Sequence, residues 1–170
     1  MCSSDLSSLT MSEPTVAVTA NITQAARIFR IDGSMSHTEA TLAIDALYIQ
    51  IMDLSPGEIP AQFRRQDLES QIRNGVISTH EFVATLATSA AYIDRFYTPY
   101  PNTKAIEFLF RHLLGRAPAS QAEIADYNRV MSEQGFVAAV NMMVDRVEYS
   151  RYFGVDVVPY HRSPSLAAGK

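Results

Sequence analysis

The sequence predicts an all-α fold: a single compact helical domain of about six or seven helices. Serine or threonine followed three residues later by glutamate occurs before three apolar runs, and such capping boxes satisfy two backbone donors at a helix start. Apolar residues in these runs recur at intervals of three and four, the period of a helix with one buried face. Strand character is confined to residues 76–77, after an Asn-Gly pair.

Length and composition agree with one soluble globular domain. The chain has 170 residues, of which 47% are hydrophobic, which is enough for one proper core. Its single cysteine, Cys2, excludes a disulfide framework and a thiolate metal site. The longest apolar run, residues 40–54, is interrupted by polar residues and is shorter than the roughly 20 residues of a membrane-spanning helix.

Four segments are expected along the chain. Residues 1–20 form a disordered leader, and the first six of them, MCSSDL, match what a sequencing-adapter read-through would encode. Residues 21–59 form an N-terminal helical extension, in which a box from Ser36 to Glu39 opens a helix. That helix is apolar nearly all round, so it is either central to the core or covered by a partner. Residues 60–162 form the main helical domain, and residues 163–170 a flexible tail.

Helix signals within residues 60–162 follow one another closely. Pro60 stands where a first-turn proline opens a helix, and capping boxes begin at Ser78 and Ser120. Residues 102–114 show the clearest apolar stripe, and Glu107 and Arg111 form an i,i+4 pair on its other side. Three glycines follow apolar runs as left-handed C-caps: Gly75, Gly115 and Gly135.

The chain carries few residues suited to catalysis. Its four histidines are far apart in sequence and none has the spacing of a helical metal site. His80 is interpreted as part of a helix start and His112 as a partly buried helix histidine. Asp145 and Glu148, the best local carboxylate pair, are interpreted as a solvated helix end. Ser89 has no histidine near it in sequence. We therefore expect no enzyme and no metal.

Arginine and tyrosine indicate a protein partner instead. Twelve of the 14 basic residues are arginine, and seven of the eight tyrosines lie between Tyr92 and Tyr160. Arginine and tyrosine are enriched at protein interfaces. A net charge of −4 and a pI near 5.5 argue against nucleic acid as the partner. Arg116 follows Gly115 in a stiff corner, where a solvated arginine and an anchor for a partner carboxylate are equally good interpretations.

Four ordered blocks resemble the phycobilisome linker polypeptide domain over about residues 60–162. They are LESQIRNGVISTHEFVATLATSAAY, IEFLFRHLLGRAP, the residues Glu123-Ile124 with Tyr127-Asn128 and Gly135, and VEYSRYFGVDVVPYHR. Within the family, FYTPYPNTKAIE and AEIADYNRVMSEQG look closest to a linker repeat of the core-membrane linker class. The chain carries one such domain, without a globin-like bilin domain or further repeats.

The resemblance implies a non-catalytic structural linker of the light-harvesting antenna. Such domains bind phycobiliprotein trimers and hexamers, join discs and tune energy transfer, and allophycocyanin of the antenna core is the implied partner. No bilin is expected to be bound covalently, although phycocyanobilin of partner subunits would lie nearby. The implied location is the cytoplasmic face of the photosynthetic membrane, which the chain would meet only peripherally through the antenna.

Loop position and residue type select seven residues for partner binding: Arg95, Tyr97, Tyr100, Arg116, Phe153, Tyr160 and Arg162. Three alternatives stay open. A rod or rod-core linker would bind phycocyanin, a bilin lyase or isomerase would need an acid/base pair in a pocket, and a regulatory helical domain would dock through residues 40–54.

Overall fold

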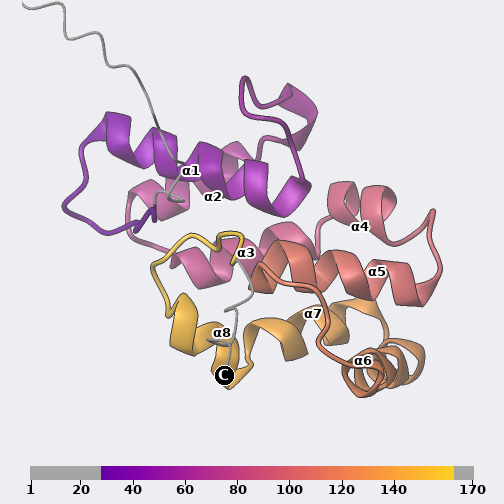
Figure 1. The fold of residues 1–170 in the computed structure, drawn as a ribbon. Helices are drawn as coiled ribbons and strands as arrows, with labels where there is room; N and C mark the ends of the chain where they lie inside the picture. Colours follow the sequence, from indigo (N-terminus) through magenta and orange to yellow (C-terminus); the bar gives the residue numbers. More distant parts are fainter. Residues whose placement is uncertain (1–27, 163–170) are drawn as a thin grey trace, which may run out of the picture.

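The computed structural model describes residues 28–162, and every regular secondary-structure element within them is a helix (Figure 1). A 3-10 turn, η1 (Ala61–Phe63), precedes the helix that begins at Gln66, and a π-helical segment, η2 (Phe110–Leu114), continues the helix that ends at Leu109. The predicted leader, the first part of the extension and the tail lie outside the described residues. The eight α-helices are α1 (His37–Met52), α2 (Gln66–Arg73), α3 (Thr79–Ala87), α4 (Ala90–Phe96), α5 (Asn102–Leu109), α6 (Gln121–Gln134), α7 (Phe136–Val144) and α8 (Val147–Tyr152).

Helix α1 belongs to the same core as the rest of the domain. It packs against α3 and η2, and its inward side chains are fully buried. Leu42 is 46% exposed, so one side of the helix faces solvent. Of the two interpretations of the apolar run, the central position in the core is therefore the observed one. The buried residues of α1 are Ala40, Ala43, Ile44, Leu47, Tyr48, Ile51 and Met52.

Serine side chains begin the predicted helices and one further helix. Ser36 and Ser78 form complete capping boxes with the glutamates three residues on. Ser120 accepts from the Glu123 amide, but the Glu123 carboxylate accepts from Ala119 N rather than closing the box. Ser89 caps the start of α4, and this cap separates α4 from α3. That cap is one reason why eight helices are observed instead of six or seven.

Two expectations differ from the structure, one about a helix start and one about strand character. Pro60 precedes the short η1 turn, and α2 begins only at Gln66. Among residues 28–162 the sole strand-like pairing is an isolated antiparallel bridge between Arg30 and Val157, and residues 76–77 take no part in it.

The bridge between Arg30 and Val157 holds the start of the described chain beside its end.

Gly115, at φ +70°, closes η2 in the left-handed conformation that glycine adopts without strain. A Cβ atom at this position would meet the carbonyl oxygen of Tyr160 at 1.9 Å. The Arg162 amide donates to the Gly115 carbonyl at 2.7 Å. Glycine is therefore required here for the backbone turn and also for the close passage of residues 160–162, which brings the C-terminal segment against the corner after α5.

Candidate functional site

The corner that follows η2 contains an ion-pair cluster centred on Arg116. Its guanidinium donates to both carboxylate oxygens of Glu148 at 2.7 Å each. It also donates to both carboxylate oxygens of Glu123, at 2.9 and 3.0 Å. Each pair is bidentate, so the two pairs fix the orientation of the guanidinium plane as well as balancing its charge. Arg116 therefore joins the loop after η2 to both α6 and α8.

Two further arginines complete this cluster. Arg146 Nη2 lies 3.0 Å from Glu123 Oε1 and 3.3 Å from Glu148 Oε2. Arg162 donates to Glu148 and, through Nε, to the Leu114 carbonyl at 2.8 Å. Hydrogen bonds from Arg116 are the main reason that the pKa values of Glu123 and Glu148 fall to about 2. Three arginines and two glutamates thus tie η2, α6, α8 and the C-terminal segment together, and Glu148 is not the solvated helix end that the sequence predicted.

Three of the seven predicted partner-binding residues have internal contacts in this part of the fold. Arg116 and Arg162 have side chains that are 21% and 14% exposed, and both are paired with Glu148. Phe153 is 1% exposed and packs on Tyr149 and Tyr160. Each of the three stabilises the fold, and their role in partner binding stays a prediction.

The corner between α4 and α5 holds three others, with more exposed surface. Arg95 lies in the last turn of α4 rather than in a loop, and its guanidinium covers the rings of Phe63 and Phe96. Tyr97 is half-buried and stacks on Phe136 with ring centroids 4.6 Å apart. Tyr100 is 43% exposed. Arg95 and Tyr100 therefore present a polar head and an aromatic ring at the surface, and the packing beneath limits how much conformational freedom binding could remove from them.

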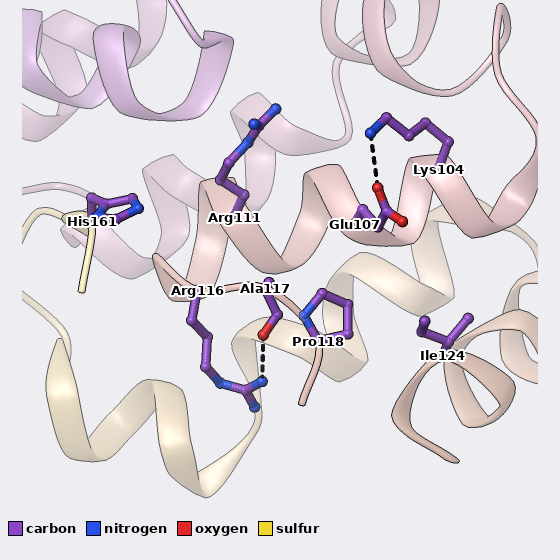
Figure 2. A pocket seen from close by; sticks show the side chains of 8 residues that line it. All are labelled: Lys104, Glu107, Arg111, Arg116, Ala117, Pro118, Ile124 and His161. Atoms are coloured by element: carbon purple, nitrogen blue, oxygen red, sulfur yellow. Dashed lines mark hydrogen bonds and ion pairs between the residues drawn. The ribbon is translucent and has the colours of Figure 1, made fainter. Parts of the chain in front are cut away.

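A pocket of about 330 Å³ opens between α5 and the start of α6 (Figure 2). Charged side chains from α5 and η2 form one side, and small apolar residues that follow Arg116 form the other. Sequence reasoning missed this pocket because the pocket combines residues from five segments of the chain. That reasoning also assigned Arg111 to a pair with Glu107. Its lining residues are Lys104, Glu107, Arg111, Arg116, Ala117, Pro118, Ile124 and His161.

The Glu107 and Arg111 side chains find different partners. Glu107 accepts from Lys104 at 2.8 Å. Arg111 lies over the Phe108 ring, and its Nη2 atom is 3.6 Å from Asp53 of α1, longer than a hydrogen bond. The helix widens to π geometry from Phe110 onward, so the i,i+4 spacing of a regular α-helix no longer describes the position of Arg111. The expected Glu107–Arg111 pair is thus wrong.

His112 is buried inside this π-helical segment. It is 1% exposed, rather than partly buried as predicted, and its Nδ1 atom lies 2.8 Å from the Tyr92 hydroxyl. Its Nε2 atom has no hydrogen-bond partner, and the Asp53 carboxylate is 3.9 Å away. Burial lowers the pKa of His112 to about 4, so the imidazole is neutral at pH 7. This histidine packs among aromatic rings and lies too deep to meet a substrate in the pocket.

The remaining chemistry-bearing residues have structural contacts. His80 lies in the first turn of α3, as predicted, and its Nε2 is 3.1 Å from the Val144 carbonyl. Across residues 28–162, no three histidine, cysteine or acidic side chains gather as a metal site would require. Within the same range, no helix is both long and apolar enough to span a bilayer.

Comparison with known proteins gives a consistent set of relatives. The model of the phycobilisome linker polypeptide family matches residues 35–162. A protein named phycobiliprotein ApcE from a Nostoc species is 56% identical over 144 residues, which cover 85% of this chain and 13% of that protein. Proteins of the same name from Microchaete diplosiphon and a Synechocystis species are 52% and 40% identical over 94% and 92% of the chain. The chain spans 13–18% of the length of these three relatives.

Proposed function

Because the chain belongs to the phycobilisome linker polypeptide family, we propose that it is a non-catalytic structural linker that binds phycobiliprotein discs in the light-harvesting antenna. The observation that carries this proposal is the extent of the family match. It runs from residue 35, just before α1, to Arg162 in the ion-pair cluster. The similarity therefore covers the whole helical core and is not limited to one short motif.

Allophycocyanin of the antenna core is the partner that we propose first. The three relatives compared above all carry the name ApcE, and the Nostoc protein keeps 56% identity over most of the chain. A linker of this kind would help to stack discs and to tune energy transfer between them. A rod or rod-core linker that binds phycocyanin is the alternative within the same family.

The surface best suited to the biliprotein is the corner between α4 and α5. Arg95 and Tyr100 are exposed there on an aromatic base, and Tyr97 adds a half-buried ring. Aromatic and arginine side chains that are held in place before binding make effective interface anchors. Tyr160 is half-buried in the segment that follows α8, where its ring meets Phe153 edge-on at 5.3 Å. We rank Tyr160 behind the other three.

The chain would carry no bilin of its own. Cys2 is the only cysteine in the sequence, which leaves residues 28–162 without a thiol for a bilin thioether. Phycocyanobilin would approach non-covalently, as part of the partner subunits. The complex would lie on the cytoplasmic face of the photosynthetic membrane as part of the phycobilisome.

Reconstitution with purified biliproteins tests the proposal. The full chain is mixed with allophycocyanin trimers and, separately, with phycocyanin, and co-migration and fluorescence emission are measured. We expect a complex with allophycocyanin and a shift of its emission. Preference for phycocyanin would select the rod-type alternative, and failure to bind either protein would contradict the linker function.

A further inference from the structure

We propose that the pocket between α5 and α6 binds a glutamate side chain, together with a neighbouring apolar side chain, from an acidic segment of the phycobiliprotein partner. The proposal rests on the linker function and names one contact through which it works. Arg111, not Arg116, would supply the charge that holds the partner carboxylate.

Arg116 is excluded as this anchor by its own geometry. Both of its carboxylate partners are bidentate, at distances between 2.7 and 3.0 Å. Its Nη1 atom also donates to the Ala117 carbonyl at 3.0 Å. In Figure 2 the Arg116 and Arg111 side chains extend in opposite directions. Arg116 thus supports the pocket wall, and its donors are already used within the chain.

Arg111 has the donor capacity that Arg116 lacks. Its side chain is 50% exposed, and its ion pair with Asp53 is 3.6 Å long. The guanidinium rests on the Phe108 ring, 5.5 Å from the centroid, which orients the stem without using the N–H groups. A guanidinium fork that is oriented but not hydrogen-bonded to a carboxylate is well suited to bidentate binding of an incoming one.

The other pocket residues determine which anion fits. Ala117, Pro118 and Ile124 form an apolar wall, so part of the ligand must be apolar. Glu107 on the opposite side is paired with Lys104 at 2.8 Å, so neither of these two charges is left over for the ligand. His161 is exposed at the edge and adds ring nitrogens for a further hydrogen bond.

The volume of the pocket limits the size of the ligand. A volume of about 330 Å³ lies at the lower end of small-molecule pockets, so the ligand must be small. One oriented guanidinium, a Lys104–Glu107 pair that balances its own charge and an apolar wall together match a singly charged carboxylate on an apolar stem. In a protein partner, a glutamate beside a leucine or a similar residue has this chemistry.

A pair of small peptides tests the pocket without any biliprotein. The full chain, labelled with ¹⁵N, is titrated with acetyl-Glu-Leu-amide and with acetyl-Gln-Leu-amide. We expect amide shifts at Ala117, Ile124 and His161, and at least threefold weaker binding of the glutamine peptide. Arg111→Gln should abolish that preference. Absence of shifts at these residues, or equal binding of both peptides to the wild-type chain, would overturn the proposal.

Binding to allophycocyanin trimers then tests the contact in its proposed setting. Arg111→Gln should weaken the complex about tenfold, as expected for the loss of one charge-assisted contact. Arg129→Gln on α6 is the matched control, because Arg129 is 61% exposed and lies outside the pocket. It should bind as the wild type does.

Steric blocking gives an independent variant. Ala117→Phe should fill the pocket and weaken the complex, whereas Ala125→Phe, on an exposed position of α6 outside the pocket, should not.

The outcomes distinguish a failure of the pocket proposal from a failure of the linker function. If the wild-type chain binds allophycocyanin and neither Arg111→Gln nor Ala117→Phe weakens the complex, the pocket proposal is wrong and the linker function stands. If the wild-type chain binds no biliprotein, the linker function fails, and with it the partner named here. Shifts at the pocket residues on deletion of residues 163–170, with no peptide present, would assign the pocket to the chain's own tail and also overturn the proposal.

Discussion

Arg116 and Arg95 both lie close to a helix end, but their neighbours differ. Arg116 is held between two glutamates in a partly buried cluster, whereas Arg95 rests on the faces of two phenylalanine rings at the surface. Carboxylates use up the donors of a guanidinium, while aromatic rings orient it and leave its N–H groups available. The Arg116 cluster is therefore suited to stability and the corner between α4 and α5 to binding.

Gly115→Ala should produce the largest loss of stability, because it disrupts the backbone on which the cluster is built. The added Cβ would meet a backbone oxygen at 1.9 Å at a position with φ +70°. We expect the free energy of unfolding to fall by about 3 kcal/mol, as measured by urea denaturation. Gly75→Ala is the matched control, since φ is +69° there with no atom within 4 Å, and should cost only about 1 kcal/mol. Equal losses would show that the close passage of residues 160–162 is unimportant.

Replacing the two arginines in parallel tests the contrast directly. Arg116→Ala removes four hydrogen bonds to Glu123 and Glu148, so we expect the free energy of unfolding to fall by about 2 kcal/mol. Arg95→Ala should change it by less than about 0.5 kcal/mol, because only surface contacts are lost. In allophycocyanin binding the order should reverse, with Arg95→Ala the more damaging of the two. A destabilised Arg95→Ala variant together with a stable Arg116→Ala variant would refute the assignment of roles.

Acid titration should reveal the cluster as a component of stability. In the folded protein the pKa values of Glu123 and Glu148 are about 2, below the ordinary value of 4.5. The unfolded chain therefore binds more protons between these values, so the stabilisation is present above pH 4.5 and is lost as the pH falls toward 2. Glu148→Gln should flatten this part of the profile by about 1 kcal/mol, an amount reduced for solvent screening.

Chemical denaturation at a series of pH values measures how steeply the free energy of unfolding depends on pH, which is the slope compared between the variants. Arg116→Ala should flatten the same window, because its guanidinium is the main cause of the low pKa values. His112 remains in all variants, so its own contribution, lost as the pH falls from 6.5 to about 4, cancels from the difference. An unchanged slope in both variants would mean that the cluster contributes nothing to acid stability.

A similarly small effect on stability is expected for the tyrosine of the same corner. Tyr100→Ala removes one edge-to-face contact with Phe108, worth about 0.5 kcal/mol. It should nevertheless weaken the complex with allophycocyanin about tenfold if this corner binds the ring. Tyr152→Ala is the control, since Tyr152 is similarly exposed at 45% but lies under Arg162 in the other region. Equal binding by the two variants would argue against the corner between α4 and α5 as the interface.

The family and the fold class could both be predicted from the sequence. Four ordered blocks predicted a phycobilisome linker domain closest to the core-membrane linker class, and the family model and the ApcE relatives confirm it. The all-α class is confirmed as well. The family match begins at residue 35, so α1, which was assigned to an extension, falls within the matched region and within the common core. The predicted partner-binding residues stay untested.

Sequence by itself determined the helices, because capping and apolar period are local. Ser36, Ser78 and Ser120 each begin a helix at the predicted place, and the stripe through Ile106 and Leu113 is fully buried. The π-helical turn that carries His112 left no such local signal.

Only the tertiary structure decided the long-range partners of Arg116 and Arg111. Arg116 is 32 residues from Glu148, and Arg111 is 58 residues from Asp53, so no local period reports either pair. The passage of residues 160–162 over Gly115 brings Arg162 to the cluster in the same way. Apolar burial needs only a helix face, but an ion pair needs two specific atoms within about 4 Å, and that distance is set by the packing of whole helices.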